Sequence, residues 1–392
     1  MSRVRLAGVI ASLLATGTAV ACAGCGSSAA PAAVSSSASA RAAAVSAEAA
    51  YSEATDQATW AVLPMGAPSG PNEFWQLFLL AAARQKWVLD TPPDIATNGA
   101  IELAGLTGTS VVTGVRPSLY LAYSPVSRTS DAGKTWAAAP PAERLADAPD
   151  ALAATPGGER LLALDEAGVA SSASSAGTVW TPLVTEHALA ATAFGRACGL
   201  TRLTAVAYSP SSARLLGGDC SRPGVAGLFT RSAGAWRAAG LVAPPALASS
   251  QIQVLRLVTA SAQTTALLAA STGSRTELLS AWLGADGKWT ESAPLSIGSA
   301  TVRTSAFGAS GALAVVLSNG HGEILSGPGG SWRQTPLVPA GRAVTIALPS
   351  GGQADALAAS AGVLAVWQLT NGGTHWAMVQ TLKVPIQYGS SS

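Results

Sequence analysis

A tryptophan that returns at regular intervals is the feature of this 392-residue chain that most constrains its fold. Seven tryptophans precede short polar or proline-containing stretches, at intervals of 43 to 56 residues: Trp87, Trp136, Trp180, Trp236, Trp289, Trp332 and Trp376. A sequence period in the forties is typical of a β-propeller, in which each repeat forms one blade of four short strands.

Each interval after the first repeat contains four apolar β-type runs, which is the number of strands in one blade. The repeat around Trp289 reads IQVLRLVTAS, TTALLAAST, TELLSAWLG and KWTESAPL. The predicted fold class is therefore all-β: a seven-bladed β-propeller of four-stranded antiparallel blades, with six or eight blades as alternatives. Because the first repeat shows only three runs, we expect the C-terminal segment 382–388 to supply its missing strand and close the ring.

The stretch 127–141, SRTSDAGKTWAAAPP, shows why small polar residues surround the repeated tryptophan. Asp131 and a neighbouring hydroxyl can accept hydrogen bonds from backbone N–H groups of a tight turn. Gly133 permits a positive φ there, and Trp136 begins the last strand of its blade as an apolar plug between sheets. The stretch is predicted to be a folding device.

The stretch also resembles the Asp-box, or bacterial neuraminidase repeat, found in sialidases and in photosystem II assembly factor-like propellers. The positions that match fully are Thr129, Asp131, Gly133, Thr135 and Trp136. TNGGTHW is a fair copy, with Asn371 and His375 as departures, and the other repeats keep mainly the glycine and the tryptophan. The resemblance implies that these turns lie on the face opposite the ligand, so no catalytic role carries over to Asp131.

The N-terminus has the layout of an export signal over residues 1–25, with Arg3 and Arg5 before an apolar stretch at 6–20. Cys22 and Cys25 both fit a bacterial lipoprotein box loosely; an ordinary signal peptide with incidental cysteines is the alternative. Residues 26–57 are rich in Ser and Ala and are predicted to form a disordered tether. The propeller is assigned to 58–388 and a tail to 389–392. The protein is expected at the outer face of the bacterial membrane, or else secreted.

Four arginines mark the predicted channel face, where propeller ligands usually bind. They stand near the start of the innermost strand in four consecutive repeats: Arg202, Arg256, Arg303 and Arg342. If they converge, they could bind a carboxylate or a phosphate. The alternative is four separate surface arginines, since the strand register could turn some of them away.

Two cysteines are expected to staple a loop on the same face. Cys198 and Cys220 fall where the first two strands of the fourth repeat meet, and in an exported protein such a pair favours a disulfide over reactive thiols. The bridge would hold the long loop 187–201 in place.

Enzyme chemistry finds less support in the sequence. A sialidase needs an arginine triad, a tyrosine activated by a glutamate and an acidic proton donor. Arg202, Arg256 and Arg303 could imitate the triad, but Tyr208 has no obvious Glu partner and is predicted to be a packed strand residue. His187, His321 and His375 are isolated, so no metal or other cofactor is expected. An aromatic content of 5% argues against nucleic acid.

The sequence favours a surface-anchored, non-enzymatic binding or adaptor propeller that recognises a protein, a glycan or an anionic ligand on its channel face. It is expected to be a monomer that meets the membrane only through a lipid anchor, with a partner at the cell surface. A sialidase-like exo-glycosidase and a purely structural envelope protein are the alternatives.

Overall fold

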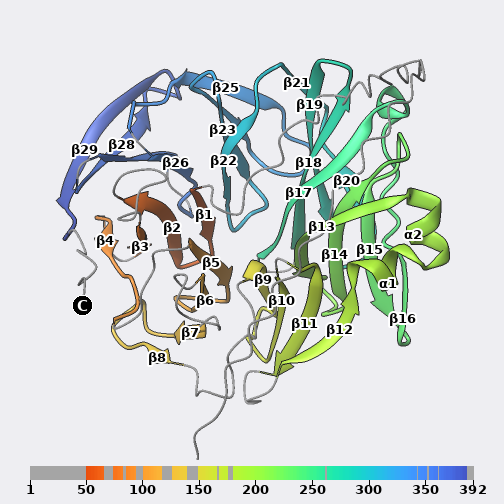
Figure 1. Ribbon diagram of the computed structural model, residues 1–392. Coiled ribbons are helices and arrows are strands. Elements are labelled where there is room, and N and C mark those ends of the chain that lie inside the picture. Colours follow the sequence, from red (N-terminus) through yellow and green to blue (C-terminus); the bar gives the residue numbers. More distant parts are fainter. Residues whose placement is uncertain are drawn as a thin grey trace, which may run out of the picture. The chain divides into compact units, whose positions relative to one another are not determined.

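The computed structural model describes residues 50–385, apart from 66–73, 83–84, 94–99, 117–125, 139–148, 166, 175–179, 261–262, 342, 351–352 and 361. The signal, Cys22, Cys25 and the tail 389–392 lie outside the described residues. Within the described part, strands dominate and the α-helices are short (Figure 1). No helix found there has both the length and the apolar character to cross a membrane.

The described strands group into seven four-stranded antiparallel units, taken in chain order. The first unit comprises β1 (Tyr51–Ala54), β2 (Ala58–Met65), β3 (Phe74–Ala81) and β4 (Val88–Leu89). The second comprises β5 (Ala100–Gly105), β6 (Val111–Arg116), β7 (Val126–Thr129) and β8 (Ala137–Ala138). The third comprises β9 (Pro149–Ala154), β10 (Arg160–Asp165), β11 (Val169–Ser174) and β12 (Thr181–Thr185).

The fourth unit follows two short helices, α1 (Glu186–Ala190) and α2 (Ala193–Cys198), and comprises β13 (Leu200–Tyr208), β14 (Arg214–Cys220), β15 (Gly227–Ser232) and β16 (Ala235–Ala238). A 3-10 turn, η2 (Pro245–Leu247), leads to the fifth unit: β17 (Gln251–Ala260), β18 (Gln263–Thr272), β19 (Arg275–Leu283) and β20 (Trp289–Glu291), with β21 (Leu295–Gly298) also paired to β19. The sixth comprises β22 (Val302–Phe307), β23 (Leu313–Leu317), β24 (His321–Leu325) and β25 (Trp332–Leu337). The seventh comprises β26 (Ala343–Ala347), β27 (Asp355–Ser360), β28 (Val363–Thr370) and β29 (His375–Lys383).

Most consecutive units pack against each other through their innermost strands, and the fifth and sixth share a hydrophobic cluster, which confirms the predicted propeller. The first and seventh units share a hydrophobic cluster that includes Phe78, Trp87 and Leu357, so the two ends of the ring meet. Strand β1 also pairs in parallel with β22 of the sixth unit, and this joins two units into one eight-stranded sheet. Because hydrogen bonding thus yields six sheets from seven units, the count of seven separate blades stays a prediction.

Strand β1 corrects two sequence-based expectations. Tyr51–Ala54 lies inside the range 26–57 that was predicted as a tether, yet it is a fully buried strand paired with β2. It is also the innermost strand that the first repeat was thought to lack. The predicted closing strand 382–388 is therefore wrong: Leu382 and Lys383 end β29 and pair with β28, while 386–388 lie outside the described residues.

The repeated tryptophans join neighbouring units, as the sequence predicted. Each stands at or directly before the fourth strand of its unit. In three consecutive units the indole N–H donates to a backbone carbonyl of the preceding unit's outer end: Trp289 to Ala239 at 2.8 Å, Trp332 to Ala293 at 3.1 Å and Trp376 to Pro336 at 3.2 Å. The tryptophan therefore contributes both apolar contact and a hydrogen bond across the boundary between units.

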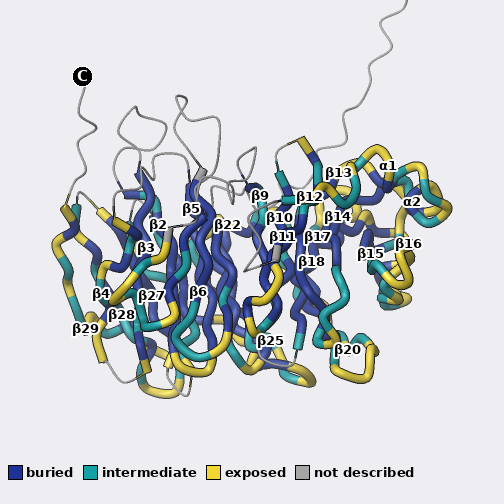
Figure 2. The backbone as a smooth tube through the Cα atoms, turned by 90° about the horizontal axis from the view of Figure 1, so that it is seen from below, coloured by how far each residue is buried: buried dark blue, intermediate teal, exposed yellow. Residues whose placement is uncertain are grey.

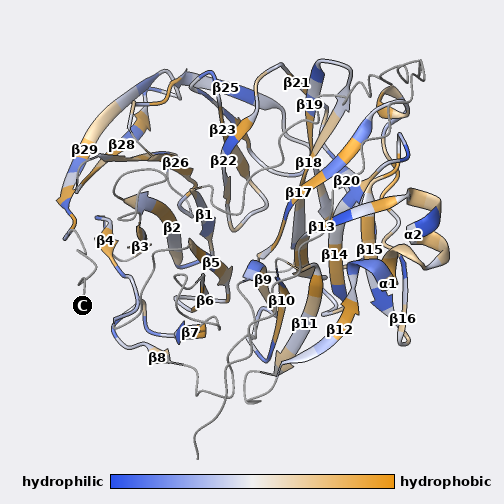
Figure 3. Ribbon diagram, in the orientation of Figure 1, coloured by the Kyte–Doolittle hydropathy of each residue, from blue (hydrophilic) through white to orange (hydrophobic). Residues whose placement is uncertain are grey.

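Burial follows the position of each strand within its unit. Figure 2 shows inner strands such as β2, β5 and β22 buried, whereas β29 at the outside carries many exposed residues. Figure 3 shows hydrophilic and hydrophobic residues alternating along β17, the period of two expected of a strand.

Candidate ligand-binding rim

The turn around Asp131 has the hydrogen bonds that the sequence predicted. The carboxylate accepts from the backbone N–H of Thr135 at 2.9 Å and from its hydroxyl at 2.6 Å, and it also accepts from the Thr129 hydroxyl at 2.9 Å. Gly133 has a φ of 72°, and a Cβ there would stand 1.6 Å from the Asp90 carboxylate. These contacts join residues of the turn to one another or to Asp90, directly after β4 of the first unit, so they have a structural role.

The predicted arginines lie in different surroundings. Arg202 and Arg303 are exposed, and Arg342 lies outside the described residues. Arg256 instead points inward, with its guanidinium carbon 3.7 Å from the ring centroid of Tyr51. A β-bulge lies between Val254 and Arg256, and a corresponding one lies between Leu200 and the exposed Arg202. Anion binding by all four arginines together stays a prediction.

The predicted loop 187–201 contains two helices, which corrects the expectation of an irregular segment. Thr185 caps α1 by accepting from the Ala188 N–H, and Thr192 caps α2 by accepting from the Gly195 N–H. Gly199 ends α2 in the left-handed conformation, with a φ of 67°. Threonine N-caps and a glycine C-cap are ordinary helix boundaries.

The disulfide between Cys198 and Cys220 is confirmed and ties this helical insertion to the innermost hairpin. Both cysteines are buried, and their Cα atoms are 5.3 Å apart. The loops beside the bridge are linked as well, because the N–H of Arg222 donates to the Cys198 carbonyl at 3.1 Å. The Phe194 ring of α2 also packs edge-on against the Phe229 ring of β15, with 5.2 Å between the ring centroids. The insertion is thus fixed at several points.

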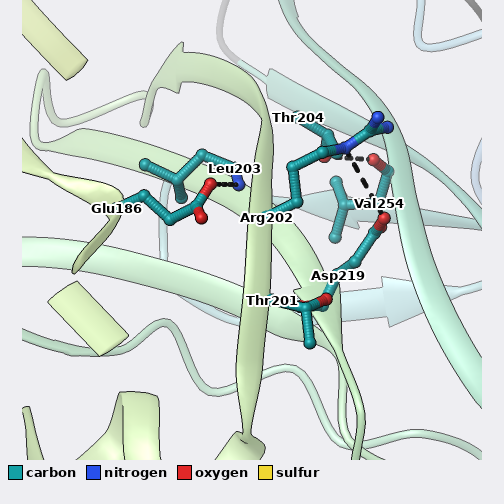
Figure 4. A network of polar contacts seen from close by, with 7 residues as sticks. All are labelled: Glu186, Thr201, Arg202, Leu203, Thr204, Asp219 and Val254. Atoms are coloured by element: carbon teal, nitrogen blue, oxygen red, sulfur yellow. Dashed lines mark hydrogen bonds and ion pairs between the residues drawn. The ribbon is translucent and has the colours of Figure 1, made fainter. Parts of the chain in front are cut away.

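Two carboxylates support the start of β13 from opposite sides (Figure 4). Glu186 of α1 accepts from the Leu203 N–H at 3.0 Å. Asp219 of β14 faces Arg202, with 3.9 Å between Oδ2 and Nε, and its backbone carbonyl accepts from the Thr201 hydroxyl at 3.1 Å. The Arg202 side chain is 53% exposed, against 5% for Asp219. Because the N···O distance is long and the Arg202 side chain is half-exposed, its guanidinium can also bind a second anion.

Three exposed arginines stand within four residues of a bridged cysteine along the chain, and we call them the arginine rim: Arg196, Arg202 and Arg222. Arg196 stands at the last turn of α2 and donates to the Ala191 carbonyl. Arg222 follows Cys220 by two residues, and Arg202 pairs with Asp219 across the β13–β14 ladder. The rim therefore presents guanidinium groups from three segments, while the acidic partner Asp219 is buried. Such an arrangement can bind carboxylates or phosphates on a partner.

A second polar cluster lies where the inner strands meet, and the sequence gave no sign of it. The hydroxyl of Tyr51 accepts from the Leu103 N–H and donates to Glu102 at 3.3 Å. Glu53 accepts from the Gly105 N–H at 3.1 Å, and burial raises its pKa to about 7 although Arg256 and this hydrogen bond act in the opposite direction. Burial, followed by the charge of Glu102, also raises the pKa of Tyr51 well above its usual value.

Neither Tyr51, in this inner cluster, nor Tyr208, on β13, offers an accessible nucleophile. Tyr51 has the acidic neighbours that a sialidase tyrosine needs, but its exposed fraction is 0%. Tyr208 is equally buried, and its hydroxyl donates to the Leu161 carbonyl at 3.1 Å, as expected of a packed strand residue. Among the residues that the structure describes, no three His, Cys, Asp or Glu side chains gather as a metal site.

Fold and rim together define a β-propeller with a disulfide-stapled insertion on one face. No protein-family model matches the chain, and no curated protein sequence matches it. Solved structures share the fold. The GH74 xyloglucanase from Xanthomonas campestris has a TM-score of 0.53 and 13% identity, over 86% of this chain and 55% of the other. The Cps50 (Swd1) β-propeller domain of Myceliophteria thermophila has a TM-score of 0.50 and 11% identity, over 82% and 94%.

A weaker similarity is to YCF48 bound to D1 peptide, with a TM-score of 0.46 and 15% identity, over 79% of this chain and 90% of the other. Similarity at this level supports no inference about function, and the two stronger ones show the fold alone. The residues of this chain must therefore carry the functional conclusion.

Sequence reasoning missed two of the three rim arginines. Only Arg202 stands at a position that recurs in successive repeats, whereas Arg196 lies in the helical insertion and Arg222 in the β14–β15 connection. Their signal was local: each stands two residues from a cysteine of the predicted disulfide. A charge fixed beside a covalent staple is better placed to bind than a charge on a free loop.

Proposed function

We propose that this protein is a non-enzymatic binding propeller whose arginine rim recognises an acidic protein or glycan at the cell surface. The observation that carries the proposal is how the rim is attached: a disulfide, two capped helices and two supporting carboxylates fix the chain segments that bear the three exposed arginines. Rigid presentation lowers the ordering cost of binding.

The choice of an acidic partner follows from the charges at the rim. Arg196, Arg202 and Arg222 are exposed, whereas Asp219 is buried and Glu186 is half-buried with one oxygen bound to the β13 backbone. The surface that a partner meets is therefore positive, although the chain as a whole carries a net charge of only +2. Local charge of this kind sets partner choice and association rate more than bulk affinity.

The test is co-sedimentation of the purified chain with cell-envelope fractions at low and moderate salt. Replacing Arg196, Arg202 and Arg222 together by Ala should reduce the bound fraction at least about tenfold, because charge-assisted hydrogen bonds contribute roughly 1.5–3 kcal/mol each. A matched variant with Arg237→Ala and Arg275→Ala, two exposed arginines of other strands, should bind as the parent does. Equal loss in both variants, or no loss in either, would rule out the rim as the binding surface.

The N-terminal cysteines suggest how the propeller is held at that surface. We propose that Cys22 or Cys25 is lipidated after export, so that residues 26–49 link the anchor to the folded part. Labelling of the expressed chain with a radioactive fatty acid should require one of these cysteines. A label that survives Cys22→Ala and Cys25→Ala combined would contradict the anchor.

A further inference from the structure

A cleft between the sixth and seventh units opens on the face opposite the arginine rim. It has a volume of about 450 Å³ and lies among the turns that join β22 to β23, β24 to β25, β26 to β27 and β28 to β29. The rim instead lies at the connections β12–β13 and β14–β15, which are at the other ends of the strands. A volume of this size is within the roughly 300–1,000 Å³ range of small-molecule sites.

The floor of the cleft is apolar. Ile324, Leu369 and Ala354 line it and belong to the hydrophobic cluster that joins the two units. Leu348 and Ala312 extend the same apolar surface from the turns. A ligand that enters the cleft therefore meets a preformed surface for a hydrocarbon group, and burying such a group is favourable.

One cation stands in the lining of this cleft. Arg333 of β25 is exposed, and its Nη1 donates to the Gly372 carbonyl of the β28–β29 turn at 2.8 Å. Gly373 makes this position possible, since a Cβ there would lie 2.5 Å from the same nitrogen. No carboxylate within the described ranges forms an ion pair with Arg333. One of its five N–H donors is thus fixed by the turn, and the others remain able to bind a ligand.

The remaining polar groups in the lining are neutral. Ser310, Ser326 and Gln353 are exposed there, and Ser350 donates to the Asp56 carbonyl at 3.0 Å. A single guanidinium above an apolar floor matches a ligand with one negative group on a hydrocarbon body. The planar fork of arginine fits a carboxylate in particular.

We propose that this interblade cleft binds a monocarboxylate with an apolar body, its carboxylate on Arg333 and its hydrocarbon part on Ile324 and Leu348. Two sources share this chemistry: a free short-chain carboxylic acid, and the C-terminal carboxylate of a peptide that ends in an apolar residue. The site is separate from the arginine rim and does not depend on the function proposed for that rim.

Calorimetric titration of the full chain tests the proposal with octanoate and octylamine, which have the same hydrocarbon chain and opposite charge. Octanoate should bind in the millimolar range or tighter, and more tightly than octylamine. Arg333→Gln should weaken octanoate binding at least about tenfold through the lost charge-assisted contact. Arg237→Gln is the matched control, because Arg237 follows Trp236 on β16 as Arg333 follows Trp332 on β25.

A second pair of variants tests the cleft without touching the charge. Ser310→Trp should cover the opening and abolish octanoate binding, whereas Ser211→Trp, in the equivalent turn of the fourth unit, should leave it intact. A peptide ending in a free Leu carboxylate, compared with its amide, identifies the source, and binding of either acid with loss in Arg333→Gln supports the proposal. Binding of neither acid, or octanoate binding that is unchanged in Arg333→Gln or Ser310→Trp, overturns it.

Discussion

Asp131 shows how one side chain can organise a turn. Hydrogen bonds from the Thr135 hydroxyl and the Thr135 backbone N–H lower its pKa to about 2. The stabilisation from this lowered pKa is present above the carboxyl's ordinary pKa and is lost as the pH falls through about 2. At neutral pH the turn therefore has its full set of bonds.

We expect Asp131→Ala to lower the melting temperature measurably, because the Thr135 N–H and both threonine hydroxyls lose their acceptor. Asp286→Ala is the control: Asp286 lies in the corresponding turn of the fifth unit, and the one hydrogen bond it accepts from the described residues comes from the Lys288 N–H, at 3.0 Å. Its effect on the melting temperature should be smaller. Equal shifts in thermal melts at pH 7 would contradict the role assigned to Asp131.

Glu53 makes the stability of the ring depend on pH. The pKa of Glu53 in the folded protein, about 7, exceeds the unfolded value of 4.5. Its contribution to the free energy of unfolding is therefore fully present below pH 4.5 and is lost as the pH rises through about 7. Tyr51 and Arg256 both interact electrostatically with this carboxyl. Asp355 behaves alike, since burial raises its pKa to about 6 against the opposing hydrogen bond from the Trp87 indole.

Glu53→Gln should remove part of this pH dependence while keeping an acceptor for the Gly105 N–H. Denaturant unfolding between pH 4.5 and 7.5 should show the parent losing stability relative to the variant, by at most on the order of 3 kcal/mol. Parallel pH profiles for the two proteins would mean that Glu53 is ionised in the folded state throughout this range.

Among the strands, β1 has the largest expected effect on folding for its length. Its four residues are all buried, and it pairs with β2 on one side and β22 on the other. A chain that begins at residue 58 should therefore lose cooperative thermal unfolding or fail to fold, since both neighbours would be left with unpaired backbone groups. A chain that begins at residue 50 should melt as the full chain does. Similar melts for both truncations would show that β1 is dispensable.

The elements that the sequence predicted well are those that the repeat specifies. The period of the tryptophans predicted the order of strands, and the spacing of Cys198 and Cys220 predicted their bond, because both depend on local pattern. Strand β1 was missed because it stands alone in a Ser- and Ala-rich segment, where Tyr51 is the one large aromatic residue. Its pairing with β22 joins residues about 250 positions apart, and no local pattern reports such a contact.

The functional residues were less predictable for the same reason. Arg256 and Arg202 each follow a β-bulge at the same place in their strands, yet Arg256 turns toward Tyr51 whereas Arg202 is exposed. The difference comes from the packing around each strand, which the local sequence does not report. The helices α1 and α2 had readable caps in Thr185, Thr192 and Gly199, yet each is only five or six residues long. Helices this short depend on the packing around them.

The two faces of the ring differ in the sites that they offer. One carries the arginine rim, held by the disulfide, and the other carries the turns and the interblade cleft. The outer strands between the faces are partly exposed, and β29 presents Met378 and Val379 at 57% and 55% exposure. A partner of the propeller must therefore be assigned to a face before its role can be interpreted.

Site-specific photo-cross-linking on intact cells makes that assignment. A photoreactive residue at Ala197, exposed beside the rim, should form an adduct that disappears when Arg196, Arg202 and Arg222 are replaced by Ala; the same residue at Ala235, exposed on the outer strand β16, should form none. This is the result expected of a partner bound at the rim. Adducts at Ala235 equal to those at Ala197, or an Ala197 adduct that survives loss of the three arginines, would contradict it.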